Sequence, residues 1–266
     1  MKIPVLVSGA SGKVGREIIK GVLSNPAVRL VGAVGHKRGV GEDIGLIIGQ
    51  QPTGIRLTSN LAETIASTNP EVVIDFTRPE IIMDNLLLIA EGGAHAVIGT
   101  TGITEADIPK ITALYKKNRV NAIIAPNFAL GAVLLLKFAE IAARFFPYVE
   151  IIETHHDQKL DAPSGTAIKY AEAIAKSAGE CYAVPTKVEK VPHVRGGELA
   201  GVKIHSLRLP GFVARHEITF GGLGQNLVLE HNSISRESFL PGVLLAVDKV
   251  RGIDGVVYGL ENLIDF

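Results

Sequence analysis

The sequence predicts an α/β protein in which a doubly wound parallel-sheet domain is joined to a smaller α+β domain with a mixed sheet. Between residues 3 and 125, short apolar runs alternate with segments of helical periodicity. This alternation is typical of parallel strands connected by right-handed crossover helices. After residue 128, three strand-like runs follow one another closely, which favours antiparallel or mixed pairing. The length of 266 residues also favours two domains.

The first domain begins with an apolar run that stops at a glycine. Ile3–Ser8 suits a buried strand, which Gly9 closes. An amphipathic helix at Lys13–Ser24 follows, because its apolar side chains recur every four residues. The other elements expected here are a glycine-rich irregular connection at 35–54, helices at Leu61–Thr68, Pro79–Glu91 and Glu105–Asn118, and strands at Val28–Val34, Val72–Asp75, Ala96–Gly99 and Asn121–Ala125.

Local signals mark two of these helix starts. Pro79 suits a first helical turn, and Thr104 with Asp107 has the spacing of a capping box. In the second domain we expect helices at Gly131–Arg144 and Gly165–Ser177 and strands at Tyr148–His155, Val202–Leu209, His216–Phe220 and Leu227–His231. A last helix at Arg236–Arg251 can close either domain. We expect the first domain to comprise residues 1–128 and 237–266, and the second 129–236.

Charge and cysteine content argue against several classes of protein. Lys+Arg and Asp+Glu both number 27, and no basic run is present, so a nucleic-acid partner is not expected. The single cysteine, Cys181, excludes an intrachain disulfide and a cysteine zinc site and fits a reducing compartment. The apolar N-terminal run is too short for a signal peptide, and the longest uncharged run contains Pro126 and Gly131. We expect a soluble cytoplasmic protein without a membrane partner.

The turn after the first strand has the character of a phosphate-binding loop. It reads G-x-x-G-x-x-G between a predicted strand and a predicted helix, where free N–H groups at the helix start bind phosphate. The spacing differs from G-x-G-x-x-G, and the alternative is a glycine-rich turn without a ligand. Its place at the start of a long α/β alternation favours a Rossmann-like dinucleotide site. The candidate cofactor residues are Gly9, Ala10, Ser11, Gly12, Lys13, Val14 and Gly15.

The end of the second strand bears on which dinucleotide is bound. NAD-binding folds usually carry an acid about 20 residues beyond the glycine loop, which holds the ribose 2′-hydroxyl. Here His36, Lys37 and Arg38 occupy that region, and no acid occurs before Glu42. A basic trio can hold a 2′-phosphate, so we expect NADPH to be preferred over NADH. The alternative is a solvated basic loop.

Two later strand ends also belong to the expected cofactor site, because ligands of doubly wound sheets lie at the carboxyl ends of the strands. The candidate residues at these ends are Gly99, Thr100, Thr101, Ala125, Pro126, Asn127 and Phe128. Phe128 can cover a nicotinamide ring, although a single phenylalanine is more often part of a core.

The densest chemistry lies between residues 153 and 167, from a predicted strand end to a predicted helix start. Lys159 supplies a positive charge, and His155 or His156 supplies a proton-transfer group near neutral pH. The helix start, where N–H groups and hydroxyls can bind a substrate carboxylate, comprises Ser164, Gly165 and Thr166. An anion site, a cation and an acid/base group within a dozen residues indicate an enzyme acting on a small anion.

Simpler interpretations apply to parts of this segment. Ser164 and Gly165 alone would indicate only a helix cap. His155 and His156 could suggest a metal pair, but neighbours on a strand point to opposite faces, and no cysteine or further histidine cluster assists them. We therefore expect no metal site.

The stretch His155-His156-x-x-Lys159-x-Asp161-Ala-Pro-Ser-Gly-Thr166 resembles the signature of the dihydrodipicolinate reductase family. The glycine loop, Phe76–Pro79, Gly99–Gly102 and Asn127–Phe128 are similar to the same family, so the similarity extends from the N-terminus through this segment. The resemblance implies reduction of 4-hydroxy-tetrahydrodipicolinate to tetrahydrodipicolinate by NADH or NADPH, in lysine and diaminopimelate biosynthesis.

The resemblance also implies roles for residues and domains. His155 would be the proton donor and acceptor, Lys159 a second catalytic donor, and His156, Gly165 and Thr166 contacts of a dicarboxylate substrate. The first domain would bind the dinucleotide, while the second would bind substrate and pair subunits into a homotetramer. Two alternatives remain: another amino-acid dehydrogenase of similar architecture, such as an aspartate dehydrogenase, and a non-catalytic NAD(P)-sensing protein. The sensor would have no need of the histidine and lysine.

Overall fold

The structure is a computed structural model that describes residues 1–36 and 38–264. The chain divides into two compact units. Unit 1 comprises Met1–Phe128 with Arg236–Phe266, and unit 2 comprises Ala129–Ser235. The C-terminal part of the chain therefore rejoins the N-terminal unit.

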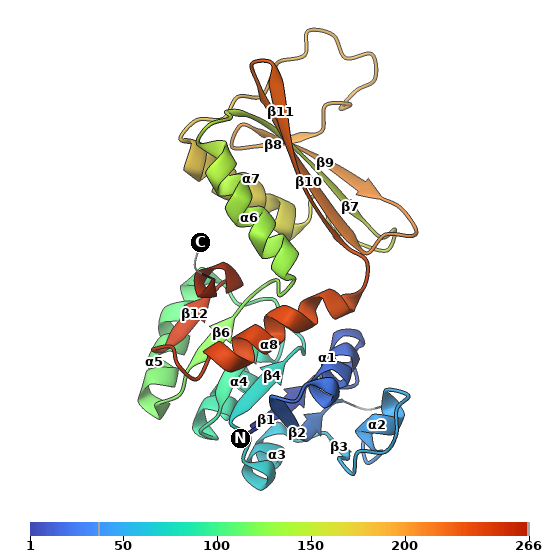
Figure 1. Ribbon diagram of the computed structural model, residues 1–266, viewed down its shortest axis with the longest axis vertical. Coiled ribbons are helices and arrows are strands. Elements are labelled where there is room, and N and C mark those ends of the chain that lie inside the picture. The colour runs from blue at the N-terminus through green and yellow to red at the C-terminus, as the bar shows by residue number, and fades with distance from the viewer. Residues whose placement is uncertain (37, 265–266) are drawn as a thin grey trace. The chain divides into compact units, whose positions relative to one another are not determined.

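Unit 1 contains a fully parallel seven-stranded sheet with the order β12-β6-β5-β4-β1-β2-β3 (Figure 1). The central strands are near-continuous apolar runs, because helices cover both faces of the sheet. The strands are β1 Ile3–Ser8, β2 Val28–Val34, β3 Leu57–Thr58, β4 Val72–Asp75, β5 His95–Ile98, β6 Ala122–Ile124 and β12 Val256–Tyr258. The predicted doubly wound α/β domain is confirmed.

The helices of unit 1 lie in two layers. One face of the sheet carries α1 (Lys13–Ser24) and α8 (Leu240–Lys249), which contact each other (Figure 1). The other face carries α3, α4 and α5, and their buried side chains form one apolar cluster with the strands. The bounds are α2 Ile44–Ile47, α3 Leu61–Thr68, α4 Ile82–Glu91 and α5 Ile108–Asn118, with short 3₁₀ turns η1 Glu105–Asp107, η2 Arg236–Phe239 and η3 Leu260–Leu263.

Of the two helix starts predicted from local signals, one differs from the expectation and the other shows the predicted capping interaction. The helix expected from Pro79 begins at Ile82 instead, after a turn closed by the Ile81 N–H and the Arg78 carbonyl at 3.2 Å. Thr104 and Asp107 do interact as expected, since an Asp107 oxygen accepts the Thr104 N–H at 2.9 Å. The strands β3 and β12 were not expected, because two or three residues carry too little periodicity to be recognised.

Unit 2 contains a five-stranded mixed sheet with the order β11-β10-β7-β9-β8. The β7–β9 pair is parallel and the other pairs are antiparallel, so the predicted mixed sheet is confirmed. The strands are β7 Tyr148–His155, β8 Gly197–Leu199, β9 Val202–Arg208, β10 Ala214–Gly222 and β11 Gln225–Ser233.

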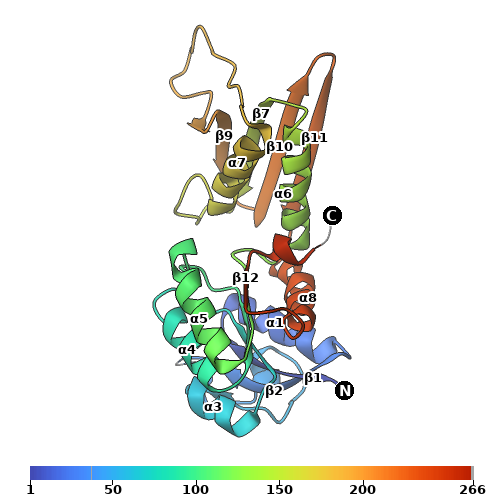
Figure 2. The ribbon, with the colours of Figure 1, turned by 90° about the vertical axis from the view of Figure 1, so that its left-hand side faces the viewer.

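Two helices, α6 (Leu130–Ala143) and α7 (Gly165–Ala178), contact each other and pack against the unit 2 sheet (Figure 2). The sheet residues beneath them are apolar, with Ile151, Ile204 and Ile218 side by side on β7, β9 and β10. Across residues 1–36 and 38–264, no helix combines the length and apolar character needed to span a bilayer.

Candidate active site

A cavity of about 620 Å³ lies at the carboxyl ends of β1, β2 and β4 in unit 1. Strand β1 has β2 on one side and β4 on the other, so the chain reverses its winding direction here, which is where doubly wound sheets bind ligands. The glycine loop and the segments after β2 and β4 all contribute to its lining, which includes Gly9, Ser11, Gly12, Gly35, His36, Asn60, Phe76, Thr77, Arg78 and Asn85.

The glycine loop can adopt its path only because it lacks side chains. Gly9 has φ +81°, and a Cβ there would lie 2.3 Å from the Phe76 carbonyl oxygen. A Cβ on Gly15 would lie 2.1 Å from the carbonyl oxygen of Gly9. Gly12 begins α1 without a side-chain cap, and the first turn of α1 holds no acid. The positive end of this helix is therefore suited to the pyrophosphate of a dinucleotide.

A buried carboxylate holds one wall of this cavity in place. Asp75, at the end of β4, is fully buried and accepts hydrogen bonds from the Thr77 hydroxyl at 2.7 Å, the Thr100 hydroxyl at 2.6 Å and the Asn85 amide at 2.8 Å. The Thr77 N–H donates to the Thr100 hydroxyl at 2.7 Å. The candidate cofactor residue Thr100 is thus itself buried, and it fixes the segment that lines the cavity.

The basic groups near the cavity agree only in part with those expected. His36 lines the cavity, Arg38 is exposed, and Lys37 lies outside the described residues. Arg78 also lines the cavity and was not among the candidate residues. It belongs to the turn before α4 and comes close only because β4 lies two strands from β2, so spacing along the chain carried no signal for it.

The remaining candidate cofactor residues occupy the ends of β5 and β6. Phe128 is only 2% exposed, and its ring packs against Phe76 with 5.7 Å between centroids, so this ring belongs to the core of unit 1. A Cβ on Gly99 would lie 2.1 Å from the Phe76 ring, which explains the absence of a side chain there. Ala125 is buried, and Pro126 and Thr101 are exposed.

In unit 2, strand register gathers polar side chains on the face of the sheet that carries α6 and α7. Residues two apart on a strand face the same side of the sheet. The residues two positions along from the buried isoleucines therefore also face α6 and α7. Glu153 on β7 pairs with Ser206 on β9 and His216 on β10, and His155 pairs with Arg208. These rows follow directly after the apolar row of isoleucines. The sheet thus changes from core to polar site along its length.

Glu153 links two of these polar groups. Its side chain is fully buried, one carboxylate oxygen is hydrogen-bonded to His155 Nδ1, and the other accepts from Arg208 Nη2 at 2.8 Å. Burial alone would raise the pKa of Glu153, but hydrogen bonds from His155, Arg208 and Ser206 outweigh it and hold the pKa well below its usual range. Glu153 is therefore ionised and accepts the Nδ1 proton, so the Nε2 atom of His155 is the one left for other partners.

His216 contacts the same cluster but has a different state. It is 3% exposed, and burial, followed by the nearby His155, lowers its pKa to about 3, so it is neutral at pH 7. Its Nε2 lies 3.2 Å from the Ser164 hydroxyl, whose oxygen also accepts the Ala167 N–H at the start of α7. The candidate residue Ser164 thus uses its hydroxyl inside the protein, as a helix cap and as a partner of His216.

The other candidate residues lie on the loop after β7 and at the start of α7. Lys159 is ion-paired with Asp161 at 2.8 Å and lowers the pKa of that carboxyl by donating to it. Gly165 is exposed, with no heavy atom within 4 Å of a Cβ placed there, and Thr166 and His156 are half-buried. These residues leave room for a ligand near the N-terminus of α7.

The expectation that no further histidine would join His155 was wrong. Glu153, His155 and His216 bring ligand-type atoms within 4.8 Å of one another. Glu153 is already paired with the guanidinium of Arg208, so the cluster is better suited to proton transfer than to holding a cation. Sequence reasoning missed Glu153, Arg208 and His216 as site residues. Only Glu153 had a signal, because it stands two residues before His155 and so faces the same side of β7.

Comparison with known proteins agrees with the resemblance seen in the sequence. Family models described as the N-terminus and C-terminus of dihydrodipicolinate reductase match residues 3–128 and 131–264. The chain is similar to 4-hydroxy-tetrahydrodipicolinate reductases of Moorella thermoacetica (49% identity over 99% of this chain and 98% of that one) and Bacillus velezensis (45% over 99% and 98%).

Solved structures give the same result. A dipicolinate-bound dihydrodipicolinate reductase from Paenisporosarcina sp. TG-14 has a TM-score of 0.88 and 41% identity, covering 99% of this chain and 100% of that one. An amine dehydrogenase from Mycobacterium smegmatis, at 16% identity and a TM-score of 0.71, covering 100% of this chain and 97% of that one, shares the fold alone. These findings favour the reductase over the rival amino-acid dehydrogenase and the sensor. The chain belongs to the dihydrodipicolinate reductase family, and it reduces 4-hydroxy-tetrahydrodipicolinate with a nicotinamide cofactor in lysine and diaminopimelate biosynthesis.

Proposed function

We propose that unit 2 binds the substrate and supplies the proton of the reaction, while unit 1 binds the dinucleotide. Converting 4-hydroxy-tetrahydrodipicolinate to tetrahydrodipicolinate replaces a hydroxyl group by hydrogen. The reaction therefore takes up one hydride and one proton and releases one water. The bound cofactor supplies the hydride, so the protein has to supply a positioned acid.

His155 is the proton donor in this proposal. The observation that carries it is the hydrogen bond between His155 Nδ1 and the buried Glu153, because it orients the ring and directs Nε2 to other partners. His216 is neutral and more deeply buried, which makes it unsuited to the role. Lys159 acts as a second donor, and its ammonium group stabilises developing negative charge.

The substrate is a dicarboxylate, and positive groups near α7 hold it. Gly165 and Thr166 offer N–H groups and a hydroxyl at the start of α7, and His156 and Lys159 lie on the loop before it. The relative from Paenisporosarcina sp. TG-14 was solved with dipicolinate, itself a dicarboxylate. We also assign Ser164 to the substrate-binding residues. Its hydroxyl caps α7 and is hydrogen-bonded to His216, so it fixes the helix start that would hold the carboxylate.

Paired substitutions of the adjacent histidines test the assignment. His155→Gln should lower kcat by about 10²–10⁴-fold, the usual cost of losing a positioned acid, and leave NADPH affinity unchanged. His156→Gln should mainly raise KM for the substrate. Steady-state kinetics with enzymatically generated substrate, together with NADPH titration, separate the two effects. The assignment fails if His156→Gln abolishes turnover and His155→Gln keeps it.

NADPH is the preferred cofactor in this proposal. The cavity of unit 1 holds the dinucleotide on the glycine loop and the ends of β5 and β6, and His36, Lys37 and Arg38 contact the 2′-phosphate. The absence of an acid from residues 35 to 41 and the presence of Arg78 in the cavity lining support this preference. We expect the reaction to take place in the cytoplasm, which suits a soluble dinucleotide and the free thiol of Cys181.

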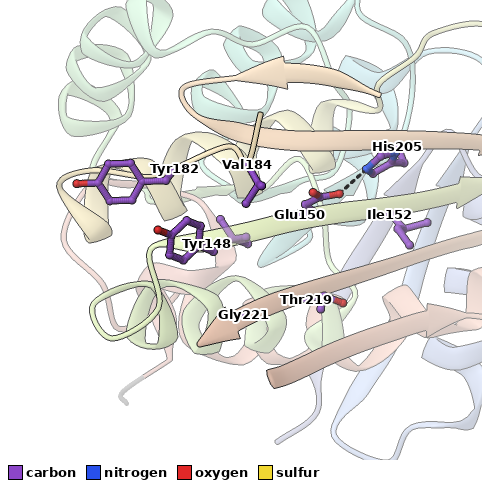
Figure 3. Close-up of a pocket in the computed structure, with 9 residues that line it drawn as sticks. Tyr148, Glu150, Ile152, Tyr182, Val184, His205, Thr219 and Gly221 are labelled. Carbon is purple, nitrogen blue, oxygen red and sulfur yellow. Dashed lines mark hydrogen bonds and ion pairs between the residues drawn. The ribbon is translucent and has the colours of Figure 1, made fainter. Parts of the chain in front are cut away.

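A homotetramer forms through the sheet of unit 2 in this proposal. The helices α6 and α7 pack on one face, and the opposite face presents Tyr148 and Val228, which are 47% and 49% exposed. A hollow of about 440 Å³ lies on that face, and its lining includes Tyr148, Ile152 and Tyr182. Figure 3 shows these three side chains. Exposed apolar groups of this kind favour burial against another copy.

Light scattering tests this assembly. The wild-type chain should give four times its 28.2 kDa mass, and Val228→Glu should give a smaller species, since a charge would then be buried in the contact. A monomer mass for the wild type at micromolar concentration would contradict the proposal.

A further inference from the structure

We propose that the buried Glu153–Arg208 ion pair is a positioning pair that holds the His155 ring and the Lys159 loop in one fixed arrangement. The proposal rests on the proposed roles of His155 and Lys159 and adds the pair that makes them act together. Nothing in the residue types alone assigns Glu153 or Arg208 this role, because they lie 55 positions apart in the chain.

The first link runs from Glu153 to the histidine. The two carboxylate oxygens have different partners, since one accepts from His155 Nδ1 and the other from Arg208 Nη2 at 2.8 Å. The Glu153 side chain is fully buried, so no water competes for either oxygen. Cross-strand register fixes the three side chains, because β7 supplies two of them and β9 the third. The carboxylate therefore selects one ring orientation and one tautomer of His155.

The second link runs from Arg208 to the lysine loop. The same Nη2 atom of Arg208 also donates to the backbone carbonyl of Asp161 at 2.6 Å. The Asp161 carboxylate in turn accepts from the Lys159 ammonium at 2.8 Å. One guanidinium nitrogen is thus shared between the carboxylate that orients His155 and the loop that carries Lys159. A shift of Arg208 would move both groups.

Stability does not account for this arrangement. Buried ion pairs contribute little to stability, because the cost of removing two charges from water offsets their attraction. The Nε atom of Arg208 is also buried without a hydrogen-bond partner among the described residues. This unsatisfied N–H adds to the cost of burying the guanidinium, so the position of its other nitrogens is the feature to be explained.

The charged and titratable groups around His155 are few. Glu153 on its own strand and Arg208 on β9 provide one negative and one positive charge, and the neutral His216 on β10 contacts the ring edge at 5.3 Å between centroids. Lys159 on the loop and His231 on β11 lie near enough to His216 that their charges also lower its pKa. Removing the Glu153 charge should therefore shift the pH profile of kcat/KM toward lower pH, because the remaining fixed charge is positive.

The first experiment measures whether Glu153 acts through His155. Glu153→Gln should lower kcat by at least about tenfold, and Glu153→Asp, which keeps the charge, should recover part of it. KM for NADPH should not change. In a His155→Gln background, Glu153→Gln should cause no further loss of kcat, because the group it positions is already absent. An additive loss in the double variant would overturn the proposal.

The second experiment measures the link to Lys159 and controls for folding. Arg208→Lys should lower kcat and shift the pH profile while thermal unfolding stays close to wild type, and its effect should be non-additive with both His155→Gln and Lys159→Gln. Glu140→Gln is the control, because it removes a carboxylate paired with Lys137 on α6 and should leave kcat and the pH profile unchanged. Wild-type kinetics in both Glu153→Gln and Arg208→Lys would overturn the proposal. If His155→Gln alone keeps full turnover, the proposed function fails instead.

Discussion

Unit 1 builds its candidate site from backbone, whereas unit 2 builds its site from side chains. In unit 1, glycines let the loop after β1 pack closely against the backbone that follows β4 and against the start of α1, and the groups proposed to bind phosphate are N–H groups. In unit 2, Glu153, His155 and Arg208 meet because strand register places them in neighbouring rows. The first site is therefore sensitive to a single added methyl group, and the second to the loss of a single polar atom.

The largest expected effect on stability comes from the same substitution made in both units. Gly9→Ala places a Cβ 2.3 Å from a backbone oxygen at a residue with φ +81°, and should destabilise unit 1 by at least about 2 kcal/mol and weaken cofactor binding. Gly165→Ala places its Cβ in open space and should leave stability unchanged while raising KM for the substrate. Thermal unfolding and NADPH titration of both variants measure the contrast. Equal stability for both would remove the distinction between the units.

This difference also explains which parts of the molecule were predictable from sequence. The glycine loop and the His155–Thr166 segment are continuous in the chain, so local pattern was enough to identify them, and the fold class followed from the alternation of strands and helices. Arg208 and His216 reach His155 only through β9 and β10, and Arg78 reaches the cavity only through strand order. Contacts that depend on register between distant strands leave no spacing signal in one sequence.

A second prediction concerns the pH dependence of stability in unit 2, which arises from the buried side chain of His216. The pKa of His216 falls from 6.5 to about 3 on folding, mainly because of burial, so the unfolded chain binds more protons between these values. The free energy of unfolding should therefore be unaffected by His216 above pH 6.5. It should decrease as pH falls from 6.5 toward 3, by up to about 1.4 kcal/mol per pH unit. The protection factors of the β7 and β10 amides, which correct for the intrinsic slowing of exchange at lower pH, should therefore fall on acidification. His216→Gln should flatten this dependence, and an unchanged slope would contradict it.

A third prediction concerns the basic side chains of unit 1 that are proposed to contact the 2′-phosphate of the cofactor. Lys37→Ala with Arg38→Ala should weaken NADPH binding by about tenfold and spare NADH, because only NADPH carries the 2′-phosphate. Arg78→Ala reports whether the additional cation in the cavity lining contributes to the same preference. Fluorescence titration with both cofactors gives the ratio. An equal loss for NADPH and NADH would show that the trio does not contact the 2′-phosphate.

The smallest expected effect tests whether the start of α7 combines both kinds of site. Thr166 offers a hydroxyl as well as a backbone N–H at the first turn of the helix, so a substrate carboxylate there would accept from both. Thr166→Val keeps the shape and the N–H but removes the hydroxyl, and should raise KM for the substrate about fivefold, the value of one hydrogen bond of about 1 kcal/mol. NADPH affinity should stay constant, because the cofactor residues belong to unit 1. Thr166→Ser restores the hydroxyl and should return KM toward the wild-type value. An unchanged KM in Thr166→Val would leave the carboxylate to the backbone N–H groups alone, making this part of unit 2 resemble the glycine loop of unit 1.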